Sequence, residues 1–80
     1  MIGVYIIQSQ KNKKFYTGSS NDIDRRIYEH NHSAGGQYSK INGPWKLVWF
    51  KEFEKIEEAR LEEKRIKSFK GGNAFKKLLN

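Results

Sequence analysis

Two tyrosines flanked by glycines stand in the most strand-like part of the sequence and could take part in chemistry. Residues 3–5 read Gly-Val-Tyr and residues 16–18 read Tyr-Thr-Gly, so the two pairs occur in mirrored order. If these segments form neighbouring strands, the phenols of Tyr5 and Tyr16 lie side by side in a site that could position a polar group or move a proton. Aromatic side chains on paired strands also stabilise a hairpin by packing alone. The two segments leave both interpretations open.

An arginine and a histidine share one face of the helix predicted to follow Asp22. Ile23 and Ile27 are one turn apart and define the buried stripe of this helix, and Arg26 and His30 lie one turn apart along its edge. A guanidinium and an imidazole would therefore stand beside the core, within reach of the phenols. The alternatives are structural: an i,i+4 ion pair between Arg26 and Asp22, and a His30 that only complements the helix dipole.

Two adjacent glutamates occupy the middle of the second long helix, which is predicted over residues 56–69. Glu62 and Glu63 project to either side of its apolar stripe. A carboxylate beside a buried stripe is costly unless it pairs with a cation or binds a metal ion. Both could instead reach solvent or pair with neighbouring lysines and arginines. The helical projection indicates that one of the two faces inward and does not select between them.

The elements that must position these side chains follow from the hydrophobic pattern and the turn residues. Asn21 is the predicted N-cap of the first helix, with Asp24 at the capping-box position, and the glycines at 71 and 72 end the second helix. We expect strands over residues 2–8, 15–18 and 45–53, and helices over residues 22–31, 56–69 and 73–79. The order β-β-α-β-α-α predicts a single α+β domain over residues 1–80, with a small three-stranded, mostly antiparallel sheet flanked by helices.

The charge of the chain indicates a polyanionic partner. Sixteen Lys and Arg residues against nine Asp and Glu give a net charge of +7, and the basic residues are interleaved with aromatic ones. Nucleic acid fits better than a membrane surface, because no predicted helix sets a basic face against an apolar one. The sequence has no cysteine and no apolar run of membrane-spanning length, so we expect a cytoplasmic protein without disulfides or thiolate zinc sites.

The spacing of these residues resembles the GIY-YIG endonuclease domain family. Its first-strand and second-strand motifs correspond to residues 3–5 and 16–18, with Val and Thr at the variable middle positions. The essential arginine of the family follows the second motif by eight residues, which is Arg26, and many members carry His or Tyr one turn later, which is His30.

The family also resolves the choice between the two glutamates. Its A-x-x-x-E pattern matches residues 59–63 and selects Glu63 as the metal ligand. The resemblance covers nearly the whole chain and is strongest to the compact bacterial stand-alone branch, which is similar to the N-terminal nuclease domain of the excision-repair incision subunit. Where some relatives carry a lysine after the second motif, this chain has Ser19.

The resemblance implies a metal-dependent endonuclease that hydrolyses DNA phosphodiester bonds with one Mg²⁺ or Mn²⁺ ion. Glu63 would hold the ion through oxygen, and Arg26 would share the negative charge that builds on the phosphate. Tyr5 is the candidate general base, and Tyr16 would position the attacking water or the phosphate. His30 would orient Tyr5 or accept its proton, and the choice between Tyr5 and His30 as the base stays open.

The resemblance further implies DNA as the partner, with branched or damaged DNA and a role in DNA repair among the candidates. Contacts with the phosphate backbone are expected from Ser19, Arg26, Lys40, Arg65 and Lys67. The alternative function is a non-catalytic nucleic-acid-binding module that has lost the activity of its relatives. The sequence indicates neither the oligomeric state nor a preference between DNA and RNA.

Overall fold

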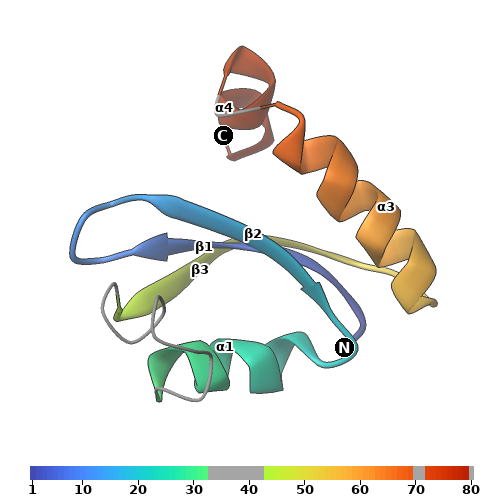
Figure 1. The fold of residues 1–80 in the computed structure, drawn as a ribbon, viewed down its shortest axis with the longest axis horizontal. Helices are drawn as coiled ribbons and strands as arrows, with labels where there is room; N and C mark the ends of the chain where they lie inside the picture. The colour runs from blue at the N-terminus through green and yellow to red at the C-terminus, as the bar shows by residue number, and fades with distance from the viewer. Residues whose placement is uncertain (33–42, 70–71, 80) are drawn as a thin grey trace.

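The computed structural model describes residues 1–32, 43–69 and 72–79. It confirms the predicted α+β fold and the order β-β-α-β-α-α (Figure 1). Within the described residues, no helix combines the length and the apolar character needed to cross a membrane. The elements are β1 (Gly3–Ser9), β2 (Phe15–Ser20), α1 (Ile23–Asn31), β3 (Trp45–Glu52), α3 (Ile56–Lys67) and α4 (Asn73–Leu79).

The three strands form one antiparallel sheet in the order β2-β1-β3. The central strand, β1, is buried at nearly every position, as its continuous run of apolar, mostly β-branched residues predicts. In Figure 1, α1 lies below the sheet and α3 and α4 lie above it, so that both faces of β1 are covered by helices.

Alternate residues of β1 enter two separate hydrophobic clusters. Val4 and Ile6 point toward α3 and α4, whereas Tyr5 and Ile7 point toward α1. The sheet therefore has two cores, and the central strand supplies both. The other buried members are Ile66 and Phe75 in the first cluster, and Ile23 and Trp45 in the second.

The start of α1 differs from the prediction by one residue. Asp22, not Asn21, is the N-cap, because its backbone is extended and its side chain accepts a hydrogen bond from the Arg25 backbone N–H at 3.2 Å. Asp24 consequently falls one position short of the capping-box position. The second helix also ends earlier than expected, at Lys67, where the Ser68 backbone N–H closes the last turn.

The close contact of Gly3 with the neighbouring strand generates a stability prediction. A Cβ at Gly3 would meet the backbone oxygen of Lys51 and lie 3.1 Å from the Cα of Glu52, and a backbone cannot move aside as a flexible side chain does. We expect Gly3→Ala to lower the free energy of unfolding by roughly 1–3 kcal/mol, as other overpacking substitutions do.

Urea denaturation of purified protein measures this change, and Gly72→Ala is the matched control. A Cβ at Gly72 would come no nearer than 3.3 Å to its closest neighbour, the Phe69 backbone oxygen, so its effect should be smaller than that of Gly3→Ala. Equal stabilities for wild type and Gly3→Ala would contradict the tight pairing of β1 with β3.

Candidate active site

Tyr5 stands at the centre of the site, on the α1 face of the middle strand. Its side chain is 1% exposed, and its hydroxyl lies 3.1 Å from Nε2 of His30. The residue opposite Tyr5 on β2 is Gly18. A Cβ at Gly18 would lie only 2.6 Å from the Tyr5 hydroxyl, so glycine is required there to give the phenol room. The two motifs occur in mirrored order because the strands are antiparallel, and their register places the glycine of the second motif opposite the tyrosine of the first.

His30 is the buried imidazole on which both tyrosines converge. It is 2% exposed, at the end of α1. Besides the contact with Tyr5, its ring packs edge-on against Tyr16 with centroids 5.3 Å apart, and tilted against Trp45 at 6.2 Å. All three strands of the sheet and the first helix thus meet at one histidine, which is far more buried than a helix-dipole role alone requires.

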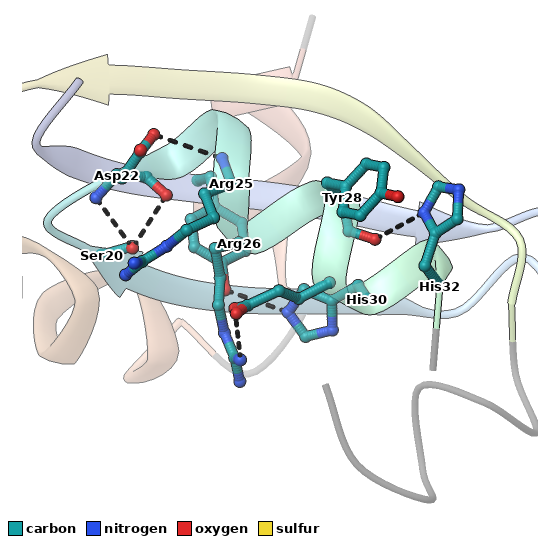
Figure 2. Close-up of polar contacts among 9 residues, drawn as sticks. Ser20, Asp22, Arg25, Arg26, Tyr28, His30 and His32 are labelled. Carbon is teal, nitrogen blue, oxygen red and sulfur yellow. Dashed lines mark hydrogen bonds and ion pairs between the residues drawn. The ribbon is translucent and has the colours of Figure 1, made fainter. Parts of the chain in front are cut away.

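Arg26 lies one turn before His30 and reaches the same side of α1, as Figure 2 shows. Its guanidinium contacts Glu29, with Nη1 3.2 Å from Oε1, and its side chain keeps 35% exposure. The alternative ion pair with Asp22 is absent from the ion pairs of the described residues, because the Asp22 carboxylate caps the helix instead. Arg26 therefore stands at the mouth of the site, next to the Tyr5 phenol and open to solvent.

Burial sets the protonation states of this cluster. Loss of water raises the pKa of Tyr5 to about 12, although hydrogen bonding from the Arg26 guanidinium works in the opposite direction. Burial, and then the positive charge of Arg26, lower the pKa of His30 below its usual range. Near neutral pH the pair is therefore a protonated phenol beside a neutral imidazole. With its proton on Nδ1, His30 can accept a hydrogen bond from the Tyr5 hydroxyl at Nε2.

The two adjacent glutamates of α3 face different strands. Glu63 turns toward β2, where its Oε1 accepts a 2.5 Å hydrogen bond from the Ser19 hydroxyl, and its Oε2 lies 2.6 Å from Nζ of Lys67. Glu62 turns toward β3, near Lys51 at 3.8 Å, and accepts two hydrogen bonds from the Arg65 guanidinium at 2.6 and 2.8 Å. Of the two glutamates, only Glu63 thus contacts β2, the strand that carries Tyr16 and pairs with the strand of Tyr5.

Neighbouring residues of β2 connect the phenol with the carboxylate. Gly18 lies against the Tyr5 hydroxyl, and the next residue, Ser19, holds Glu63. The carboxylate is close enough to add to the upward shift of the Tyr5 pKa. The structure therefore gathers the five residues predicted as catalytic around one short segment of the edge strand. They are Tyr5, Tyr16, Arg26, His30 and Glu63.

The residues predicted to contact nucleic acid are spread more widely. Ser19 and Lys67 bind Glu63 directly. Arg65 lies on the other side of α3, bound to Glu62, and Lys40 falls outside the described residues. The sequence analysis allowed both glutamates to pair with neighbouring lysines and arginines, and the pairs of Glu63 with Lys67 and of Glu62 with Arg65 are of this kind. It missed the hydrogen bond from Ser19, which joins two distant segments and leaves no local signal.

The donor set at Glu63 suits one hard divalent cation with few protein ligands. Within the described residues, no three His, Asp or Glu side chains cluster as a metal cage would require. A single carboxylate oxygen and a neighbouring hydroxyl are nevertheless what Mg²⁺ uses when it keeps several waters and meets a phosphate. The ammonium of Lys67 already occupies the position of a cation against Glu63, so the carboxylate attracts positive charge there.

Comparison with known proteins identifies the family of this chain. The sequence profile of the GIY-YIG catalytic domain matches residues 1–76. A UPF0213 protein of Clostridium perfringens is 42% identical over 64 residues, spanning 80% of this chain and 68% of the relative. A UPF0213 protein of Staphylococcus saprophyticus is 39% identical over 66 residues, spanning 82% of this chain and 79% of the relative. The solution NMR structure of a UPF0213 protein from Bacillus halodurans superposes with a TM-score of 0.51 at 32% identity, over 96% of this chain and 80% of that one.

The fold and the matching profile together define a nuclease domain. The chain belongs to the GIY-YIG family, and the small UPF0213 proteins are among its relatives.

The lowered pKa of His30 generates a prediction about pH and stability. Because the folded protein disfavours the imidazolium, the unfolded chain binds a proton more readily at His30 than the folded chain does. The stability contributed by a neutral His30 is therefore complete above the usual histidine pKa of 6.5 and falls as the pH drops through that value. Urea denaturation at about pH 7.5 and about pH 5.5 should show a lower free energy of unfolding at the acidic value.

His30→Gln should reduce this dependence, because it removes the titrating ring while retaining a polar side chain. The Glu62 carboxyl, whose pKa is held below 4.5 mainly by hydrogen bonds from Arg65, titrates beneath this range and does not interfere. An unchanged dependence in His30→Gln would contradict the assignment of the effect to His30.

Proposed function

We propose that the protein is a divalent-metal-dependent endonuclease that hydrolyses phosphodiester bonds in DNA. The observation that carries the proposal is that Glu63 binds Ser19, the residue after Gly18, while Gly18 faces the Tyr5 hydroxyl that contacts His30. Membership in a nuclease family and the net charge of +7 support a polyanionic substrate.

Glu63 would hold one Mg²⁺ or Mn²⁺ ion, with Ser19 steadying its carboxylate through the existing hydrogen bond. The bound ion would neutralise charge on the phosphate and favour its attack by water. Lys67 pairs with the same carboxylate and must release it when the ion arrives. Its ammonium would then be free to contact a phosphate of the DNA backbone.

Arg26 would bind the phosphate that is cut. Its partly exposed guanidinium stands next to the Tyr5 phenol and can place two N–H donors on phosphate oxygens, where they stabilise the charge of the transition state. Glu29 would keep the guanidinium oriented while the phosphate is absent, through the 3.2 Å contact.

Tyr5 and His30 would act together as the base. With a pKa near 12, Tyr5 carries almost no phenolate at neutral pH and cannot act as the base alone. The attacking water would instead give a proton to the Tyr5 oxygen while Tyr5 gives its own to Nε2 of His30. The water oxygen bonds to phosphorus, the bond from phosphorus to the leaving oxygen breaks, and the leaving oxygen takes a proton from solvent water. One proton of the attacking water thus reaches the Tyr5 oxygen, and the former phenol proton ends on the imidazole. Tyr16, packed on that ring, would hold it in place and help to position the water.

The central test compares Glu63→Gln with Glu62→Gln, an equivalent change one residue away on the same helix. Cleavage of supercoiled plasmid and of labelled branched oligonucleotides would be measured with Mg²⁺, with Mn²⁺ and with EDTA. We expect Glu63→Gln to lose about a hundredfold or more of the wild-type rate. Glu62→Gln should keep a rate close to wild type, because Glu62 binds Arg65 and Lys51 on the other side of α3.

Two results would overturn these assignments. Cleavage that survives Glu63→Gln and is lost in Glu62→Gln would show that Glu62, not Glu63, holds the metal ion. A wild-type protein that binds these DNAs without cutting any of them would make the chain a non-catalytic nucleic-acid-binding module.

The ion pair between Lys67 and Glu63 generates a separate prediction about metal affinity. Lys67→Met removes the cation that competes for the carboxylate, so Mn²⁺ should bind more tightly, by roughly two- to fivefold for a partly exposed pair. Titration of Mn²⁺ into the DNA-free protein, followed by electron paramagnetic resonance, measures the affinity. Lys64→Met, an exposed position on the same helix, is the control. Equal or weaker Mn²⁺ binding by Lys67→Met would contradict the competition.

A further inference from the structure

A groove runs along the α3 side of the edge strand, next to the site described above. It has a volume of about 570 Å³, within the usual size range of small-molecule pockets. Thr17 of β2, Ile66 of α3 and Phe75 of α4 are the buried residues that line it. The groove therefore forms where two helices meet the strand that carries the second motif.

One wall of the groove is an aromatic ring open to solvent. Phe15 is 43% exposed and packs edge-on against Phe75, with ring centroids 5.4 Å apart. Because Phe75 is buried and supports Phe15 from one side, part of the Phe15 ring remains uncovered at the mouth of the groove. A fixed and partly exposed ring of this kind offers a surface on which a planar group can stack.

The charge of the groove selects the kind of planar group. Lys14 and Lys67 also line it, and none of the described residues that line it is acidic. Aromatic surface flanked by lysines is the combination that binds single nucleotides of an unpaired strand, where the base stacks on the ring and the phosphates meet the ammonium groups. A purely apolar peptide would gain nothing from the two lysines.

The groove lies next to the candidate site. Lys67 lines it and binds Glu63, and Tyr16 also belongs to its lining, while the Tyr16 ring packs against His30 on the α1 face of the sheet. A strand whose phosphate lies at Arg26 and Glu63 could therefore place a neighbouring nucleotide in the groove without leaving the surface of β2.

We propose that this groove is a base-binding subsite that takes one unstacked base of the DNA strand being cut. The base stacks on Phe15, and the phosphates beside it contact Lys14 and Lys67. The proposal deepens the proposed endonuclease function and rests on it. It adds that a nucleotide next to the cleaved bond must leave the base stack for the phosphate to reach Glu63.

The test separates recognition of the base from attraction to the phosphates, and it needs no metal. Fluorescence anisotropy in EDTA compares an oligothymidylate of about twelve nucleotides with an abasic strand of the same length and charge. Wild type should bind the abasic strand roughly tenfold more weakly. Phe15→Ala should bind both strands as weakly as wild type binds the abasic strand, because the ring on which the base stacks is gone. Phe15→Trp should restore the difference.

Phe50→Ala is the matched control, because Phe50 is 49% exposed on β3 and does not line the groove. It should keep the wild-type preference for strands with bases, and circular dichroism establishes that each variant is folded. A wild type that binds both strands equally, or a preference that Phe15→Ala retains, would overturn the proposal. A dimer in light-scattering measurements that Phe15→Ala dissociates, without any change in DNA affinity, would assign the groove to a second copy of the chain.

The result is independent of whether the protein cuts DNA. If the preference for bases depends on Phe15 but the protein cleaves no DNA, the subsite is supported and the proposed endonuclease function is overturned. If cleavage depends on Glu63 but Phe15→Ala changes the affinity for neither strand, the endonuclease function is supported and the subsite is overturned.

Discussion

The pairing of Tyr5 with Gly18 across β1 and β2 is the constraint on which the candidate site depends. A side chain at residue 18 would collide with the phenol, so the absence of a Cβ allows a large buried ring to reach His30. Burial of that ring then keeps the phenol protonated, and burial of His30 keeps the imidazole neutral. The protonated phenol can therefore contact the neutral imidazole because a glycine on the neighbouring strand leaves room for the ring.

The second half of the site comes from the opposite face of the sheet. Side chains alternate along β2, so that Tyr16 packs with the cluster next to α1 while Thr17 and Ser19 face α3. Because β2 is the edge strand, groups from both faces can meet at its outer side. If β2 were a central strand, another strand would cover its outer side, where Tyr16 and Glu63 now lie on opposite faces. In the proposed function, the edge position of β2 allows an imidazole from one helix and a carboxylate from another to act on one phosphate.

The fold could be predicted from the sequence because its signals are local. Hydrophobic runs, turn residues and one strongly helical segment predicted all six elements and their order, and no end differs from the observed one by more than two residues. Asn21 and Asp22 are both good caps, and only the backbone angles select Asp22. Arg26 pairs with Glu29 instead of Asp22, whose carboxylate caps the helix and lies 4.0 Å from the N-terminal ammonium of Met1.

The candidate site was only partly predictable. Helical projection brought Arg26 and His30 to one face, but it could not choose between Glu62 and Glu63, because both flank the same stripe. Family spacing favoured Glu63, and the contact with Ser19 gives that choice a physical basis. The groove beside Phe15 left no trace in the sequence, because it forms between segments that are far apart along the chain.

The small size of Ala59 has a consequence for how α3 is set against the sheet. Ala59 and Ile66 are two turns apart, and both are fully packed, at 0% and 1% exposure. Together they fix the rotation of the helix about its own axis. Adjacent helical residues point about 100° apart, so a rotation of α3 by about that angle would withdraw Glu63 from Ser19 and bring Glu62 toward β2. The buried alanine thus helps to determine which of two chemically identical side chains faces β2.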